Sequence, residues 1–269
     1  MARLIEYRPK TMADFLVQVE ALQAASKNAL WFRGAATASH RLIPSLYRHP
    51  TITTETELQA LESKLIIRFR QRSVPYHGRD LSDDWESLFF MQHYGVPTRL
   101  LDWTENPFTA LYFALMTGSP TSKDDGKNHQ SAAVWILDPY SWNQAALKRV
   151  TYTGGPFVPG DRDLGAYNPG STPSAANAHP VALFGAHNSP RIVAQQGVFT
   201  IFGTSRVPME NLVRDDTIPA SALSRVVIPP SRTLRMRDSL LNFGVTESTV
   251  FPDLEGLARE TKRLFGFNA

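Results

Sequence analysis

The run Ala132-Ala133-Val134-Trp135-Ile136-Leu137 restricts the fold of this chain more than any other segment. An uninterrupted apolar run of this kind, ended here by Asp138-Pro139, is typical of a central strand buried on both faces. Such a strand needs other strands beside it and helices over its faces. The chain can build that core, because 42% of its 269 residues are hydrophobic. This composition excludes a disordered chain, a collagen and a small disulfide scaffold.

Strands and helices are expected to alternate on both sides of this run. Short apolar segments predict strands at Leu30–Phe32, Val198–Phe202 and Ser224–Ile228. Helical spacing and capping residues predict helices at Met12–Ala25, Glu57–Arg72, from Ser82 to before Gly95, Asn106–Gly118, up to Lys148, Ser231–Asn242 and Pro252–Phe265. The repeated switching predicts a mixed α+β fold, with residues 1–269 in a single domain.

The stretch from 153 to 190 differs from the rest of the chain. It is rich in Gly, Pro, Asn and Ser and poor in charge. We expect a long loop here, and long structureless loops in compact domains are usually lids, binding loops or disordered segments.

The charge balance narrows the possible partners only slightly. The chain has 28 Lys and Arg against 25 Asp and Glu, a formal net charge of +3. This excess permits contact with a polyanion without requiring it. The chain has no cysteine, which excludes disulfides, thiol nucleophiles and Cys-ligated metal centres. Apolar runs too short for a bilayer and a start without a secretory signal predict a cytoplasmic protein with no membrane partner.

An arginine and a glycine directly follow the predicted strand at Leu30–Phe32. Arg33 at a strand end has a planar set of donors suited to an anion or amide, and Gly34 would let a ligand approach the backbone. The alternative is that Arg33 pairs with a structural carboxylate. Arg41 and Arg48 follow closely, and they either extend the same pocket or stay in solvent.

The segment from Met91 to Pro107 is expected to join two apolar helices by a turn that contains Gly and Pro. Leu100 and Leu101 indicate partial burial, so Asp102 and Thr104 need specific partners, because an unpaired buried polar group costs roughly 1–3 kcal/mol.

The same polar residues also have structural interpretations. Asp102 would pair with Arg33 or Arg99, and Thr104 or Asn106 would cap the following helix. A buried pair of Arg33 with Asp102 would make either substitution cost about 3–5 kcal/mol, because the remaining charge would be uncompensated.

The seven histidines are scattered, and no metal-binding, Walker or dinucleotide-binding motif is present. The sequence therefore predicts no metal. His93 is a candidate general base, and its alternative is a hydrogen-bonded structural residue at a helix end.

Two amides, Gln195 and Gln196, come immediately before Gly197 and a predicted strand. This position places polar side chains on the rim of the sheet, after the long loop. Their alternative is that they are plain loop residues.

Taken together, these motifs give the chain a family resemblance. It resembles the FRG domain, a bacterial family named for its Phe-Arg-Gly tripeptide, with members associated with toxin–antitoxin and phage-defence settings. The matching stretches are Trp31-Phe32-Arg33-Gly34, Leu42–Arg48, Gln92–Thr104, Asn106-Pro107, Ala110–Ala114, and Arg191 with Gln195–Phe199.

The order of these elements is also similar to that of ADP-ribosyltransferases, which implies a split central sheet with flanking helices. In that superfamily a strand-end Arg or His with its Gly holds NAD, a middle Ser/Thr segment shapes the nicotinamide pocket, and a late-strand Glu acts on the ribose or the nucleophile. The implied site residues are Arg33 and Gly34 for NAD, Trp103 and Thr104 for the nicotinamide wall, and Gln195 or Gln196 for the third position.

This chain departs from that pattern at the third position. Glutamine does not ionise, so it can orient a hydroxyl but cannot stabilise an oxocarbenium-like transition state by charge. Asp102 is the first candidate for that carboxylate and Glu210 the second.

The resemblance implies an NAD-dependent ADP-ribosyltransferase that acts as a toxin or phage-defence effector. NAD would be the co-substrate and a nucleic acid or protein the acceptor, with RNA modification favoured by the basic balance. An antitoxin or chaperone is a possible partner. The alternatives are a non-catalytic module that binds a nucleotide or a partner, and a toxin-type nuclease that uses His93, Arg99 and Asp102.

Overall fold

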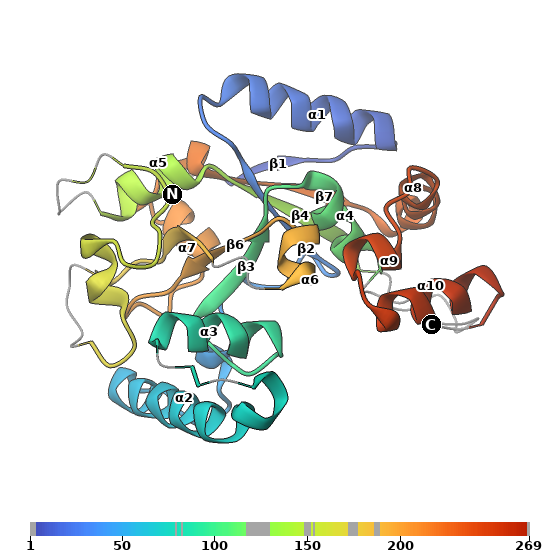
Figure 1. The fold of residues 1–269 in the computed structure, drawn as a ribbon. Coiled ribbons are helices and arrows are strands. Elements are labelled where there is room, and N and C mark those ends of the chain that lie inside the picture. Colours follow the sequence, from blue (N-terminus) through green and yellow to red (C-terminus); the bar gives the residue numbers. More distant parts are fainter. Residues whose placement is uncertain are drawn as a thin grey trace.

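In the computed structural model, a seven-stranded mixed sheet lies at the centre of the part of the chain that is described (Figure 1). The structure describes residues 4–78, 80–81, 83–116, 130–147, 152, 154–171, 177–185 and 189–267. The strand order is β1-β7-β4-β2-β3-β6-β5, and only β1 and β7 run parallel among these neighbours. The strands are β1 (Ile5–Tyr7), β2 (Trp31–Ala35), β3 (Leu100–Thr104), β4 (Ala132–Leu137), β5 (Val181–Phe184), β6 (Gly197–Ile201) and β7 (Leu223–Ile228).

Several of the helices begin where the sequence supplies a capping side chain. The Thr11 side chain accepts from the Asp14 backbone N–H and the Asp14 carboxylate accepts from that of Thr11, which is a capping box. The helices are α1 (Met12–Ala25), α2 (Glu55–His77), α3 (Asp84–His93), α4 (Pro107–Met116), α5 (Pro139–Ala146), α6 (Pro190–Ala194), α7 (Met209–Arg214), α8 (Pro230–Asn242), α9 (Glu247–Val250) and α10 (Leu254–Leu264), with 3₁₀ turns η1 (Leu46–Arg48), η2 (Arg162–Tyr167) and η4 (Ala220–Ala222).

Helices cover both faces of the sheet, as the fully buried strand β4 requires. On one face, apolar residues of α1, α4 and α8 pack against Phe32, Val134 and Val226. On the other face, α5, α7 and η1 pack against Trp31 and Trp135. A third apolar cluster lies between α3 and the strands β3, β5 and β6. The predicted mixed α+β fold is therefore confirmed.

Three strands were not predicted, and the first of them is the short β1. The segment expected to be a turn between helices contains β3, which pairs with β6 along its whole length. The predicted loop at 153–190 contains β5 and η2, and the side chains of Phe157, Tyr167 and Leu183 are buried. The loop prediction is therefore wrong for these residues, since they belong to the core. The predicted ends at Ser82, Gly118 and Lys148 lie outside the described residues.

The C-terminal helix α10 is held to α9 mainly by polar contacts. The Glu260 carboxylate accepts from the Ser248 backbone N–H and the Thr246 hydroxyl, and Arg263 donates to Glu247. Its apolar side chains are exposed, as at Leu254, Leu257, Leu264 and Phe265.

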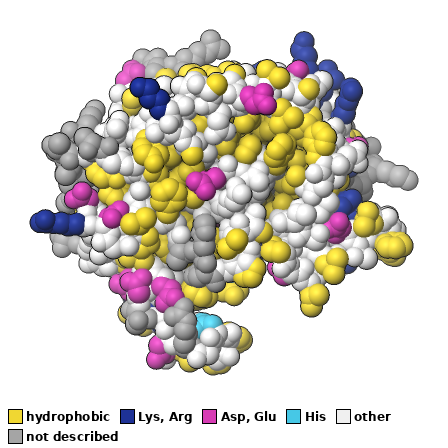
Figure 2. All heavy atoms as spheres, turned by 45° about the horizontal axis from the view of Figure 1, so that its top comes forward, with side chains coloured by type: hydrophobic (Ala, Val, Ile, Leu, Met, Phe, Trp, Pro, Cys, Tyr) yellow, Lys and Arg dark blue, Asp and Glu magenta, His cyan; other side chains and the backbone are white. Residues whose placement is uncertain are grey.

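Apolar surface is also widespread on the α1 side of the molecule, where Figure 2 shows large hydrophobic areas with few charged side chains.

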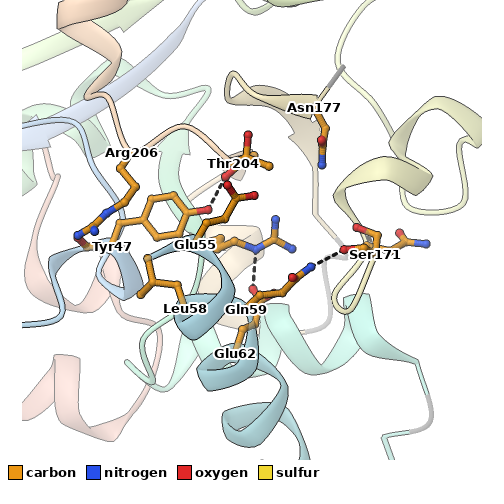
Figure 3. A pocket seen from close by; sticks show the side chains of 12 residues that line it. Tyr47, Glu55, Leu58, Gln59, Glu62, Ser171, Asn177, Thr204 and Arg206 are labelled. Atoms are coloured by element: carbon orange, nitrogen blue, oxygen red, sulfur yellow. Dashed lines mark hydrogen bonds and ion pairs between the residues drawn. The ribbon is translucent and has the colours of Figure 1, made fainter. Parts of the chain in front are cut away.

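A buried ion pair fixes α2 to the start of β3. The Arg99 Nε donates to the Glu62 Oε1 at 2.7 Å, and the Glu62 side chain is 2% exposed. Arg99 also donates to the backbone carbonyls of Tyr167 and Phe202. Figure 3 shows Glu62 and Gln59 projecting from α2 at this place. The remaining space of about 30 Å³ is about the size of one water molecule, so this pocket is structural.

Replacing Glu62 tests this anchor. We expect Glu62→Gln to lower the free energy of unfolding by about 3–5 kcal/mol, because Arg99 would keep a buried charge without its counter-ion. Urea denaturation measures the loss. Glu55→Gln is the matched control, since Glu55 borders the same pocket but is exposed. Equal stability of the two variants would contradict the assigned role of the pair.

Gly34 is required by the packing of α4 on β2. A Cβ at this position would lie 2.0 Å from the Ala110 backbone oxygen and 2.6 Å from the Ala114 backbone nitrogen. The absence of a side chain therefore lets the α4 backbone lie directly on the strand. The first role of Gly34 is in packing, and ligand approach, which the sequence suggested, is not what requires a glycine here.

Gly34→Ala should destabilise the protein by about 1–3 kcal/mol or more, because neither α4 nor β2 can move without disturbing the core. Thermal unfolding followed by circular dichroism measures the effect. Gly165→Ala is the control, since an added Cβ there meets no atom within 4 Å. A melting temperature of Gly34→Ala equal to that of the control would refute the packing argument.

Candidate functional site

The site lies where the central strands β2 and β3 separate. These strands share one residue pair, Phe32 with Thr104, whereas β2 pairs with β4 along its length and β3 does so with β6. Arg33 bridges the gap beyond this pair, because its Nη1 donates to the backbone oxygen of Asp102 at 2.5 Å. A side chain thus takes the place of sheet hydrogen bonding.

The gap opens into a cleft of about 250 Å³. Its polar and apolar lining residues come from six elements, several of which are distant in the sequence. The residues are Phe32, Arg33 and Gly34 of β2, Phe89, Gln92 and His93 of α3, Asp102, Trp103 and Thr104 of β3, Phe113 of α4, Arg191, Ile192 and Gln195 at α6, and Gly197 and Phe199 of β6.

Asp102 is the carboxylate of the cleft. Its Oδ2 accepts from the Gln92 Nε2 at 2.8 Å, and the Gln92 Oε1 accepts from the Thr98 hydroxyl at 2.5 Å. The buried Thr98 therefore fixes the orientation of the Gln92 amide, which in turn holds one oxygen of Asp102. The other oxygen makes no hydrogen bond with a described residue.

Asp102 lies within ion-pair distance of Arg33, as one of the alternatives predicted, but the pair is not buried. The Arg33 Nη1 lies 3.8 Å from the Asp102 Oδ2, and the Asp102 side chain is 56% exposed. The backbone oxygen of Asp102 is the closer partner of Arg33, and Glu62 is the partner of Arg99. The carboxylate is therefore hydrogen-bonded to Gln92 on one side and open to solvent on the other. Replacing the Asp102 side chain should lower the stability of the protein only slightly.

Thr104 and Gln195 border the cleft but are tied to the backbone. The Thr104 hydroxyl donates to the Gln195 backbone oxygen and accepts from the Asn106 N–H, and the Gln195 Nε2 donates to the Val250 oxygen. Asn106 caps α4, as one alternative predicted. These contacts join β3 to the turn before β6, so both side chains shape the wall.

Three of the predicted site residues do not have the surroundings that were expected for them. Trp103 touches the cleft, but its side chain is buried in the core and its indole N–H donates to the Thr200 hydroxyl. Gln196 has a left-handed backbone with φ of 47° and an exposed side chain, and it does not line the cleft. Glu210 is buried on α7 and accepts from the Leu42 N–H, away from the cleft.

A cationic group of α6, Arg191, lines the cleft together with Asp102. Arg191 stacks on the Phe251 ring with 4.5 Å between its Cζ and the ring centroid. Burial lowers the pKa of Arg191, while Asp102 and Asp253 act in the opposite direction. His93, at the end of α3, has a lowered pKa because it is partly buried and close to Arg191. Its imidazole is therefore neutral near pH 7 and able to accept a proton.

NMR titration of the His93 ring measures this lowered pKa. The ring signals are assigned to His93 by their absence from the spectrum of His93→Gln. We expect a midpoint below about 6.5, the value of an unperturbed histidine. Because the unfolded chain then binds the proton more tightly, the His93 contribution to stability is present above pH 6.5 and falls as the pH decreases below it. Arg191→Gln should raise the midpoint, and an unchanged or lower midpoint in that variant would contradict the electrostatic cause.

Sequence reasoning gave no role to two residues of this site, Gln92 and Arg191. Both stand within motifs that the sequence singled out, Gln92 beside His93 and Arg191 shortly before Gln195. Their place beside Asp102 depends on how α3 and α6 pack on the sheet. The sequence pattern that could have indicated them is the cluster of polar residues next to apolar segments that are expected to be buried.

The described residues contain no group of three or more His, Asp or Glu side chains that could hold a metal ion. Among the described helices, none has the length and apolar character needed to cross a bilayer.

Comparison with known proteins gives one match. Residues 28–123 match the family model of the FRG domain. The matched range begins before β2 and extends beyond α4, so it holds the cleft residues of β2, α3, β3 and α4. The match supports the FRG family for this part of the chain. No curated protein and no solved structure gives a significant match to the chain.

Proposed function

We propose that the chain binds NAD in the cleft between β2 and β3 and transfers its ADP-ribose group to an acceptor. One observation carries the proposal: Arg33, Asp102 and Gln195, which come from distant parts of the sequence, border the same cleft. A shared cleft is the arrangement that a dinucleotide site would need. A domain without a ligand has no need to collect two arginines, a histidine and an open carboxylate around one cavity.

The lining suits the two chemical parts of a nicotinamide nucleotide. Arg33 and Arg191 would bind the pyrophosphate, because guanidinium groups form charge-assisted hydrogen bonds with phosphate oxygens. The apolar walls at Phe113 and Phe199 would hold the nicotinamide ring, since aromatic rings pack well on one another. Gln195 would stay a wall residue, because its amide is already bound to Val250.

Asp102 would supply the charge that a glutamine in the third position cannot. In the reaction the bond between the ribose C1′ and the nicotinamide nitrogen breaks, and its electron pair leaves with neutral nicotinamide. The acceptor nucleophile forms the new bond to C1′ and loses a proton. The Asp102 carboxylate would stabilise the positive charge that develops at C1′ and receive that proton, and Gln92 would position it.

The test is to incubate the purified full chain with labelled NAD and, separately, total RNA, single-stranded DNA and a protein lysate. We expect release of nicotinamide and transfer of label to one of these acceptors. Asp102→Asn should lower the rate by about 10²–10⁴-fold, the range for loss of a general acid–base group. Its stability should change by less than about 1 kcal/mol, because the side chain is mostly exposed.

Asp215→Asn is the matched control, since it removes an exposed carboxylate on another part of the surface. Full activity of Asp102→Asn would exclude the assigned role. Binding of NAD without nicotinamide release or transfer would instead favour the non-catalytic module, and shortening of RNA in the absence of NAD would favour the nuclease.

A further inference from the structure

A second groove begins where the cleft ends. It has a volume of about 960 Å³ and shares Arg33 and Gly34 with the cleft. Most of its other lining residues lie between Ala35, the last residue of β2, and Arg48, and Arg206 is added from the segment after β6. Whatever lies in this groove is therefore next to the carboxylate of the cleft.

The groove is lined by cations. Four arginines border it, Arg33, Arg41, Arg48 and Arg206, and no Asp or Glu is among the described residues that line it. The chain as a whole has an excess of only three positive charges, so the cations are concentrated here. Arg48 lies close enough to Arg33 to lower its pKa, in addition to the larger effect of burial.

The two outer arginines are available to a ligand. Arg41 and Arg48 are exposed, and neither forms an ion pair with a described residue. Arg206 is different, because its guanidinium donates to the backbone oxygens of Thr53 and Tyr47. Anions placed between these side chains would relieve the repulsion between them.

We propose that this groove binds the phosphates of a single-stranded nucleic acid, which is the acceptor of the reaction. This inference rests on the proposed function of the cleft. A dinucleotide has one pyrophosphate, for which Arg33 and Arg191 suffice, whereas a strand has one phosphate per nucleotide and can use the outer arginines as well. Among the described lining residues, the exposed ring able to stack on a base is that of His40, because Tyr47 is buried; stacking tolerates any base, so we expect recognition of the backbone with little sequence preference.

Binding is tested without NAD, by fluorescence anisotropy of labelled single-stranded 12-mers of RNA and of DNA at several salt concentrations. We expect the double variant Arg41→Gln/Arg48→Gln to weaken binding at least tenfold. The slope of log K against log salt should become shallower by about 1.4, because each contact to a single strand contributes about 0.7. The RNA and DNA arms decide which strand is preferred.

The matched control is Arg68→Gln/Arg72→Gln, which removes two exposed charges from α2 at a different surface. It should bind like the wild type, and all variants should melt like the wild type. Binding of the groove variant equal to that of this control would overturn the proposal. The proposal would also be overturned if the 12-mers did not bind and the groove variant had a higher Kd for NAD than the wild type. The groove would then be part of the dinucleotide site.

The two proposals fail in different ways. Asp102→Asn should still bind the 12-mers, because it leaves the groove intact. Wild-type binding without transfer would exclude the reaction and keep the groove as a nucleic-acid site. Transfer to protein with no binding of RNA or DNA would exclude the groove inference and keep the reaction.

Discussion

β2 and β3 are neighbours at the middle of the sheet, yet they share only the pair of Phe32 with Thr104. Buried backbone groups need hydrogen-bond partners, so a gap in the middle of a sheet has to be filled by something other than a strand. Arg33 fills it by donating to the Asp102 backbone oxygen, which places a cation beside an open carboxylate. The missing pairing between β2 and β3 thus accounts both for the cleft and for the charged side chains beside it.

The parts of the fold that depend on local pattern were predictable. The helix Met12–Ala25 and the strand Ala132–Leu137 agree with the structure, because a capping box and a continuous apolar run specify them locally. The strands β1, β3 and β5 were not predicted. In β3 the side chains of Asp102 and Thr104 interrupt the apolar pattern, and β5 is a short strand in a Gly/Pro-rich stretch; both are specified by pairing with β6, a contact between distant residues.

The same division applies to the site. Arg33, Asp102 and Gln195 were chosen by residue type and motif, and they do border one cleft. Their partners were not predictable from spacing. Arg99 faces Glu62 instead of Asp102, and Gln92 holds Asp102 only because the buried Thr98 orients its amide. Gln195 and Gln196 are adjacent in sequence, but the left-handed backbone at Gln196 turns the second amide away from the cleft.

The tripeptide Phe32-Arg33-Gly34 combines three requirements in consecutive residues. Phe32 makes the last pair with β3, Arg33 spans the gap, and Gly34 admits the backbone of α4. Side chains alternate between the two faces of a strand, so a shift of one residue would exchange their directions. An insertion or deletion within this strand would turn the guanidinium towards α4 and put a side chain where none fits. This short segment therefore tolerates changes in neither length nor order.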